Sequence, residues 1–134
     1  MPIKNFIIAL LAASGTGFTC AAAAAEVFVI ANASVRMTPA ELREVYLGER
    51  QFDSGRRLVP MDNASLQKDF VQRVVGIDAS KYGTVWAKKG FREGLNPPSV
   101  LGGDAEVIAA VRATPGAIGY VSHLPQGVHL VDKY

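Results

Sequence analysis

The sequence predicts an α/β domain in which a mixed β-sheet carries helices on its faces. Two short apolar runs, Val27–Ala31 and Ala117–Val121, have the length and composition of buried strands. Between them lie several segments whose apolar residues recur at helical spacing. The expected order is strand, helix, strand, three helices and two strands, with no internal repeat and no second domain boundary.

The first elements are well marked. Val27–Ala31 is continuously apolar, which predicts a central strand buried on both faces. Thr38–Glu41 reads T-P-A-E and predicts a helix start, with threonine at the N-cap, proline first in the helix and glutamate three residues after the cap. Gly48 is expected to end this helix, and Gln51–Gly55 to form a polar loop.

The middle of the chain predicts a short strand and two helices. Leu58–Val59 is expected to be a strand that stops before Pro60. One helix is expected to open within Asp62–Ser65, which offers several possible N-caps, and to close at Gly76. Another is expected to run from Asp78 to Lys89. Glycine and proline then accumulate up to Gly103, which predicts one long connection.

The last third contains the most distinctive stretch, Thr114–Tyr120, which reads T-P-G-A-I-G-Y. Asp104 is expected to cap the helix before it, Pro115-Gly116 forms a turn, and a buried strand follows. Gly119 lies inside that strand, where glycine marks a close approach by another group. A crossing helix is the favoured explanation, and an approaching ligand is the alternative. A final strand is expected at Val128–Val131.

The first 25 residues are predicted to be a cleaved signal peptide, which leaves one domain at 26–134. Lys4 is followed by the apolar run Phe6–Ala13, and Ala23–Ala25 satisfies the small-x-small cleavage pattern. A membrane anchor is disfavoured because the run is shorter than the ~20 residues that span a bilayer. A lipoprotein is disfavoured because Phe18 and Thr19, rather than small residues, precede Cys20. Contact with the membrane would therefore be transient.

The composition limits the compartment and the partners. Cys20 is the single cysteine and would leave with the signal peptide, so the mature chain would form no disulfide. An exported domain without disulfides fits a bacterial periplasm. The chain has 14 basic and 12 acidic residues. This near balance disfavours nucleic acid as a partner.

Enzymatic constellations are not recognisable in the sequence. No nucleophile elbow, phosphate-binding P-loop or dinucleotide fingerprint occurs, and no acid–base pair is visible. His123 and His129 lack neighbouring carboxylates or thiols at metal-ligand spacing, so surface histidines are the simpler interpretation. The sequence therefore predicts no enzyme, no metal site and no cofactor.

The best candidate for a ligand site is Asp62–Ser65, comprising Asp62, Asn63, Ala64 and Ser65. If a helix opens here after a strand, its free N–H groups and dipole could hold an oxyanion, with donors added by Asn63 and Ser65. Simple helix capping is the alternative. Asn-Ala-Ser also occurs at Asn32–Ser34, and the two copies would share one edge if their strands were neighbours.

Several of these stretches together resemble the phosphate ABC transporter substrate-binding proteins, in particular short, single-domain members of the periplasmic-binding-protein-like type II superfamily. The resemblance is carried by V-Y-L-G-E-R at Val45–Arg50, by A-T-P-G-A-I-G-Y-V at Ala113–Val121, by Trp86 with Phe91, and by Pro97-Pro98. It implies a single type II lobe, a mixed sheet flanked by helices. Relatives clamp phosphate between two such lobes and deliver it to an inner-membrane transporter.

The sequence departs from this family in length and in chemistry. The chain is about one lobe long. Relatives carry a D-G-S-G-T-like loop, and matching its aspartate to Asp62 places Ala64 and Leu66 at the hydroxyl positions. Pro60 stands where an arginine is common. Backbone N–H groups would remain as donors, with charge supplied by arginine: the candidates are Arg36, Arg56 and Arg57.

Two functions therefore remain open. The first is a periplasmic solute-binding protein that holds phosphate or another oxyanion at Asp62–Ser65 and works with an inner-membrane transporter or a partner lobe. The alternative is a ligand-free single lobe that mediates protein–protein interaction through an exposed apolar patch.

Overall fold

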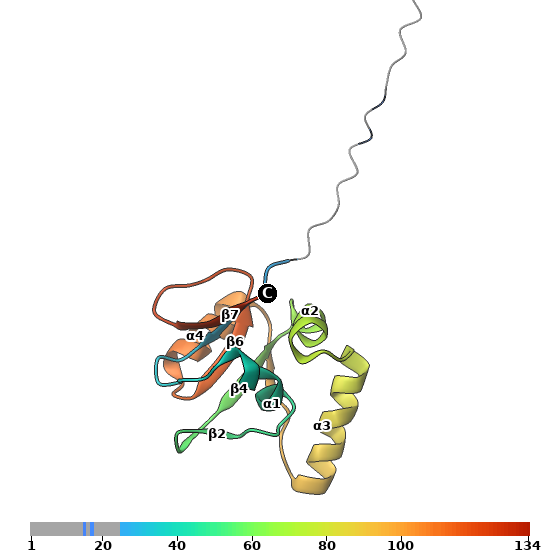
Figure 1. Cartoon of the computed structure of the whole chain (residues 1–134), viewed down its shortest axis with the longest axis vertical. Coiled ribbons are helices and arrows are strands. Elements are labelled where there is room, and N and C mark those ends of the chain that lie inside the picture. The colour runs from blue at the N-terminus through green and yellow to red at the C-terminus, as the bar shows by residue number, and fades with distance from the viewer. Residues whose placement is uncertain (1–14, 16, 18–24) are drawn as a thin grey trace, which may run out of the picture.

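The computed structural model describes residues 15, 17 and 25–134, which form a five-stranded sheet, a two-stranded hairpin and helices (Figure 1). The strands are β1 (Phe28–Ala31), β2 (Phe52–Asp53), β3 (Arg56–Arg57), β4 (Val59–Asn63), β5 (Ser99–Leu101), β6 (Ala117–Val121) and β7 (His129–Lys133). The helices are η1 (Pro39–Glu41), α1 (Leu42–Tyr46), α2 (Gln67–Phe70), η2 (Val71–Val75), α3 (Ala79–Glu93) and α4 (Asp104–Ala113).

The sheet has the order β5-β4-β6-β1-β7 and is mixed, as the sequence predicts. β4 pairs in parallel with β5 on one side and with β6 on the other. β1 pairs antiparallel with both β6 and β7, and it is the buried inner strand that its apolar run predicts. The parallel strands β4, β5 and β6 therefore end at one common edge of the sheet.

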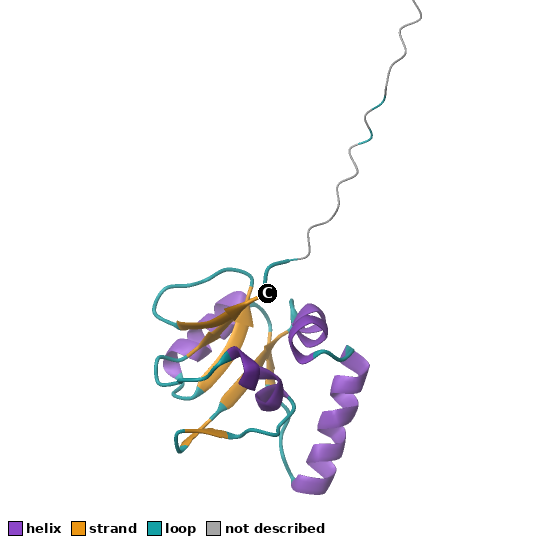
Figure 2. Cartoon of the chain, viewed as in Figure 1, coloured by secondary structure: helices purple, strands orange, loops and turns teal. Residues whose placement is uncertain are grey.

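Helices cover both faces of the sheet, so the domain has three layers (Figure 2). Successive residues of a strand point to opposite faces. In β6, Ile118 and Tyr120 pack in the larger core with α1, α2 and α3, whereas Ala117 and Val121 pack in the smaller core under α4. The same alternation in β4 directs Met61 toward α4 and Asp62 toward the other helices.

Gly119 in β6 lies directly under α4. A Cβ atom at this position would come within 2.6 Å of Val107 Cγ1 and 3.2 Å of Val111 Cγ2. Both valines are buried on the inner face of α4. The prediction of a crossing helix is confirmed: glycine is required here because α4 packs against the strand backbone.

Two predicted boundaries are wrong around β4. The strand runs through Pro60 and ends at Asn63, and the following helix begins at Gln67 with Leu66 as its N-cap rather than within Asp62–Ser65. Asp62 and Asn63 are therefore strand residues. The strand continues because pairing with β5 and β6 on both sides overrides their low intrinsic strand preference.

Two short structural elements lie in segments predicted to be loops. Gln51–Gly55 belongs to the β2–β3 hairpin, whose turn residues Ser54 and Gly55 have positive φ angles of 49° and 79°. The long connection before Gly103 contains β5, which pairs with β4. Both predictions missed strands of only two or three residues.

Helix starts are predicted with mixed success. The Thr38 N–H donates to Glu41 Oε2 at 3.1 Å, and the Asp78 carboxylate accepts from the Lys81 N–H at 2.7 Å, as expected of N-terminal caps. The cap of α4 is Gly103, however, and not Asp104. The Asp104 carboxylate is instead engaged with neighbouring strand ends.

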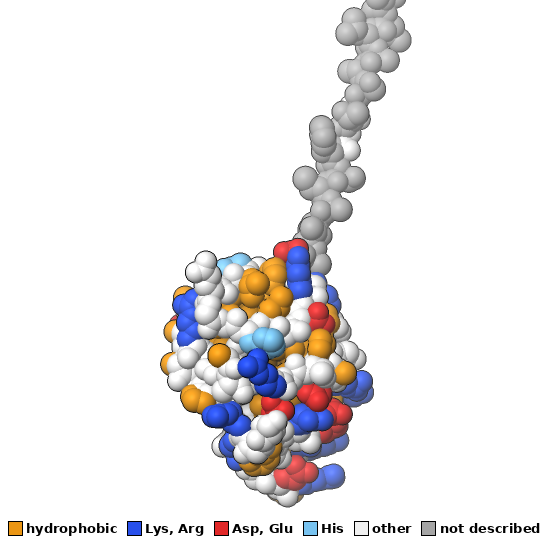
Figure 3. Space-filling view, turned by 60° about the vertical axis from the view of Figure 1, so that its left-hand side comes forward, with side chains coloured by type: hydrophobic (Ala, Val, Ile, Leu, Met, Phe, Trp, Pro, Cys, Tyr) orange, Lys and Arg blue, Asp and Glu red, His pale blue; other side chains and the backbone are white. Residues whose placement is uncertain are grey.

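The predicted signal peptide lies almost entirely outside the described residues. Among the residues that are described, no helix combines the length and apolar character needed to cross a membrane. On the face drawn in Figure 3, basic and acidic side chains are interspersed over the lower part of the domain. That mixture is consistent with the nearly equal counts of the two charges.

Candidate functional site

The common edge where β4, β5 and β6 end is the natural place for a ligand, because crevices at the carboxyl ends of parallel strands are the usual sites in α/β sheets. β4 ends there at Asn63, β5 at Leu101 and β6 at Val121. Asp62–Ser65, predicted from the sequence as the ligand segment, lies at this edge.

Asp62 is a buried carboxylate held by three side-chain donors. Its exposed fraction is 1%. The Tyr120 hydroxyl donates to Oδ1 at 2.8 Å, and the Tyr82 hydroxyl donates to Oδ2 at 2.9 Å. The Gln67 amide adds a longer bond to Oδ2 at 3.3 Å. Three elements, β6, α3 and α2, therefore converge on one strand residue.

Aromatic packing fixes the position of the Tyr120 hydroxyl. The Tyr120 ring stacks on Phe70, with centroids 3.8 Å apart and planes inclined by 8°. Tyr46 meets Phe70 edge-on at 4.6 Å, and its hydroxyl donates to the Met61 carbonyl at 2.9 Å. The ring cluster therefore fixes the direction of this donor.

The environment of Asp62 shifts the pKa of each group in the cluster. Burial raises the pKa of Asp62, and the hydrogen bonds from Tyr120, Tyr82 and Gln67 offset only part of that effect. Burial, followed by the negative charge of Asp62, raises the pKa of both tyrosines. The tyrosines therefore remain neutral donors at physiological pH.

Asn63 points to the opposite face and joins the three strand ends. Its side-chain amide donates to Asp104 Oδ1 at 2.8 Å and to the Tyr120 carbonyl at 3.0 Å. Its side-chain oxygen accepts from the Ser65 N–H at 3.0 Å. Asn63 is fully buried with every polar group bonded, so its side chain organises the edge and has no donor left for a ligand.

Asp104 completes this network at the first residue of α4. It accepts from the Ser122 N–H at 3.2 Å and from the Ser122 hydroxyl, and His123 Nδ1 lies 3.3 Å from Oδ2. Burial alone would raise the pKa of Asp104, but hydrogen bonds from Ser122 and Asn63 outweigh it and lower the pKa below its ordinary value. A carboxylate therefore already occupies the start of α4.

The backbone donors of the predicted segment are partly used within the protein. The Ala64 N–H donates to the Leu101 carbonyl at 2.9 Å, and the Leu66 N–H donates to the Asn63 carbonyl at 3.0 Å. The N–H groups of residues 67–69 have no protein acceptor within the described part of the chain. The available donors therefore lie a few residues later than the sequence predicts, in the first turn of α2.

The candidate arginines lie at the opposite edge of the sheet. Arg57 precedes β4, and Arg36 follows β1, which is antiparallel to β6. The two Asn-Ala-Ser segments are likewise at opposite edges, because β1 runs antiparallel to β6 whereas β4 runs parallel to it. Both still form the same local turn, since Asn32 Oδ1 accepts from the Ser34 N–H at 3.0 Å as Asn63 does from Ser65.

A cavity of about 660 Å³ opens beside the Asp62 cluster. Asp62, Gln67 and Tyr82 line it next to the cluster, and further residues of α3 and the loop 94–98 complete it. Its rim carries two apolar side chains that are largely exposed, Phe91 at 93% and Val100 at 56%. The cavity therefore combines a few polar groups with mostly apolar lining residues.

Sequence reasoning missed three residues of this cluster: Gln67, Tyr82 and Tyr120. Tyr82 lies in the helix predicted from Asp78 to Lys89 and Tyr120 in the predicted buried strand, and neither prediction considers the hydroxyl. The available signal was general: a buried tyrosine needs a hydrogen-bond partner for its hydroxyl, and Asp62 was the uncommitted acceptor between them.

The fold and this edge define the class of the domain, a three-layer α/β domain with its candidate site at the carboxyl ends of parallel strands. No protein-family model matches the chain, and no curated protein matches it either. Among solved structures, the chain is similar to a Clostridium perfringens protein described as a phosphate ABC transporter substrate-binding protein with bound phosphate. The TM-score is 0.58 at 16% sequence identity, over 80% of this chain and 45% of that chain.

A second solved structure is an ABC-type phosphate transport receptor from Vibrio cholerae, with a TM-score of 0.49 and 11% identity over 80% of this chain and 46% of that chain. The matched region thus spans less than half the length of either neighbour. At this level of identity, the similarity to the first structure establishes the fold.

Proposed function

We propose that the protein is an extracytoplasmic solute-binding lobe that holds a small oxyanion, phosphate in the first instance, at the carboxyl end of β4. The observation that carries the proposal is the cavity beside Asp62. There, a buried carboxylate that accepts three hydrogen bonds adjoins the first turn of α2, whose N–H groups have no protein acceptor among the described residues. The phosphate bound to the Clostridium perfringens neighbour supports the choice of ligand. A transporter in the inner membrane would be the recipient of the solute.

The residues divide the work of binding in this proposal. The N–H groups of residues 67–69, the Gln67 amide and the exposed Ser65 hydroxyl supply donors to the oxyanion. Ala64, which is exposed directly after β4, has a small side chain and so leaves room for the oxyanion. Asn63 holds the edge together through Asp104.

Asp62 sets which oxyanions are accepted. A carboxylate offers about four acceptor positions, and three are occupied here by protein donors. The remaining position can accept a hydrogen bond from an anion that carries its own proton. Phosphate has such a proton at neutral pH and sulfate has none, so phosphate should be preferred.

Isothermal titration of the purified protein with phosphate and with sulfate at pH 7 tests the proposal. We expect heat with phosphate and a much weaker response with sulfate. Gln67→Ala should weaken phosphate binding by about tenfold, as loss of one hydrogen bond to a charged group predicts. Gln72→Ala, an exposed glutamine on η2, is the matched control and should bind as the parent does.

No heat at millimolar phosphate would refute the proposal. Asp62→Asn provides a second check, because an amide places a donor where the protonated anion needs an acceptor, and the preference for phosphate over sulfate should disappear. The ligand-free interaction module is not favoured, since the solved structure that shares the fold has phosphate bound.

A further inference from the structure

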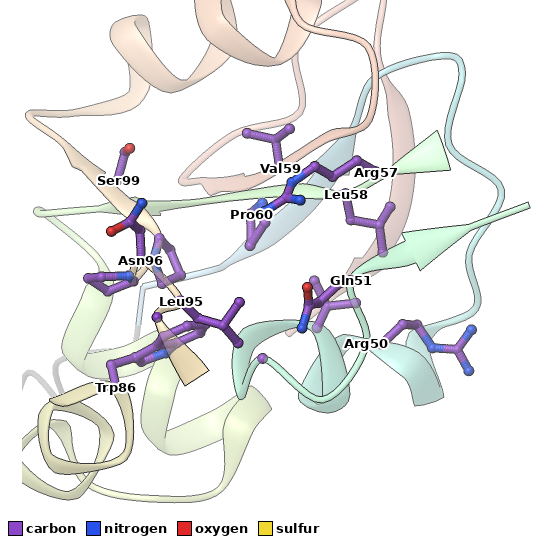
Figure 4. Close-up of a pocket in the computed structure, with 15 residues that line it drawn as sticks. Arg50, Gln51, Arg57, Leu58, Val59, Pro60, Trp86, Leu95, Asn96 and Ser99 are labelled. Atoms are coloured by element: carbon purple, nitrogen blue, oxygen red, sulfur yellow. The ribbon is translucent and has the colours of Figure 1, made fainter. Parts of the chain in front are cut away.

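We propose that a second, smaller cavity, at the opposite edge of the sheet, binds a small organic carboxylate through Arg57. This cavity has a volume of about 220 Å³ and lies where β4 begins at Val59 and β5 begins at Ser99 (Figure 4). β4 separates it from the edge at Asn63. The two cavities share Trp86 and the loop 94–98, but Arg57 lines only the smaller one, and Asp62 and Gln67 line only the larger one.

The backbone of the β2–β3 hairpin positions the polar side chains of this cavity. Arg57 pairs with Phe52, and the Leu58 N–H donates to the Gln51 carbonyl at 2.8 Å. Gly116 packs so closely on the hairpin that a Cβ atom there would lie 2.2 Å from the Arg57 carbonyl oxygen. The backbones of Gln51 and Arg57 are thus held in place at the edge of the cavity.

The cavity carries an uncompensated positive charge. None of its lining residues is acidic. Arg50 also lines it, but its guanidinium is paired with Glu44 at 3.1 Å and turns away from the other lining side chains (Figure 4). Within residues 25–134, the Arg57 guanidinium has no ion-pair partner, and Figure 4 shows it extending over Pro60 into the cavity.

The remaining polar groups suit a carboxylate. A guanidinium binds a carboxylate through two parallel N–H bonds, which makes arginine the preferred partner of this group. Gln51, Asn96 and Ser99 add uncharged donors around the rim. The site therefore offers one charge-assisted contact and several neutral ones to a single anionic head.

The floor is apolar and rigid, so the ligand also needs an apolar body. Trp86 Nε1 donates to the Tyr46 carbonyl at 3.0 Å, and its ring packs on Gly48, where a Cβ atom would lie 2.8 Å from Cη2. Leu95 and Pro60 complete this floor. At about 30 Å³ per water, the volume admits roughly seven water-sized groups, which fits a four- to six-carbon carboxylate.

Trp86 is the single tryptophan of the chain, so its fluorescence reports on this cavity directly. We expect sodium butyrate to produce a saturable change in the emission of the full-length protein. Butyramide, which is neutral and has nearly the same shape, should produce no saturable change over the same concentrations. Arg57→Gln should weaken butyrate binding at least about tenfold, because it removes the charge-assisted contact.

Arg56→Gln is the matched control, since Arg56 is the exposed neighbour with the same charge but does not line the cavity. It should bind butyrate as the parent does. Gln67→Ala should also bind butyrate normally, which distinguishes this site from the proposed phosphate site, because Trp86 lines both cavities.

Three results would overturn the proposal. They are the absence of a saturable response to butyrate, equal affinity for butyramide, and unchanged affinity in Arg57→Gln. A loss of butyrate binding in Gln67→Ala would place the ligand in the other cavity and would equally exclude this assignment. Circular dichroism of each variant verifies that it is folded.

Discussion

Replacing Tyr120 by phenylalanine tests how the buried carboxylate is stabilised. The substitution removes the hydroxyl that donates to Asp62 Oδ1 at 2.8 Å and keeps the ring that stacks on Phe70. Asp62 would then retain only the two donors on Oδ2. A hydrogen bond to a charged group contributes about 1.5–3 kcal/mol, so the free energy of unfolding at pH 7 should fall by about 2 kcal/mol.

The loss should depend on pH in a defined direction. Removing a donor destabilises the ionised form of Asp62 and therefore raises its pKa further. In the parent, the Asp62 pKa is higher in the folded state than in the unfolded state. The folded protein therefore loses stability as pH rises from the ordinary pKa of an aspartate through this raised pKa. The variant extends this loss to higher pH. The difference between parent and variant should therefore be largest at pH 7 and shrink toward pH 4.

Urea unfolding at pH 7, 5.5 and 4, followed by Trp86 fluorescence and circular dichroism, measures this difference. Tyr46→Phe is the control, because the Tyr46 hydroxyl donates to the neutral carbonyl of Met61 at 2.9 Å. It should cost about 1 kcal/mol at every pH. The reasoning is refuted if Tyr120→Phe shows the same loss at pH 4 and pH 7, or no more loss than the control.

Three further substitutions test the packing and the sheet edge. Gly119→Ala places a methyl group 2.6 Å from Val107 Cγ1, so unfolding by urea should show a loss of about 1–3 kcal/mol from overpacking. Gly83→Ala, in α3 with open space around the new Cβ, should instead raise the free energy of unfolding by about 0.5–1 kcal/mol, which a higher melting temperature would show. Asp104→Asn weakens the acceptor of Ser122 and should lower the free energy of unfolding by about 1 kcal/mol at pH 7 and by less at pH 3. The Asp104 pKa is lower in the folded state than in the unfolded state, so the ionised carboxylate stabilises the fold above the unfolded-state pKa. This stabilisation is lost as pH falls through the folded-state pKa. An Asp104→Asn loss that is equal at both pH values would contradict this role.

Local patterns predicted the parts of the fold that depend on local chemistry. A few neighbouring residues are enough to predict the apolar run of β1, the capping motif at Thr38 and the close packing at the glycine in β6. β4 was different, because Pro60 and Asp62 are poor strand residues taken alone. Only the pairing with β5 and β6, which are distant in the sequence, makes that segment a strand.

The candidate site shows the same division. Asp62 was found because it follows a strand, but its partners come from α3 and β6, 20 and 58 residues away in the sequence. Arg57, close to Asp62 in the sequence, belongs to the other edge of the sheet. The local sequence therefore identifies Asp62, which carries the charge, but it does not identify the tyrosines that surround it.

The alternation of polar residues at the end of β4 also determines the register of the sheet. A shift of β4 by one residue would turn Asp62 toward the valines under α4 and Asn63 toward the aromatic rings. Neither side chain would then find its present partners, and a buried carboxylate without donors is strongly unfavourable. The same residues that form the candidate site thus exclude misaligned pairings during folding, so variants here should be examined for strand slippage as well as for lost binding.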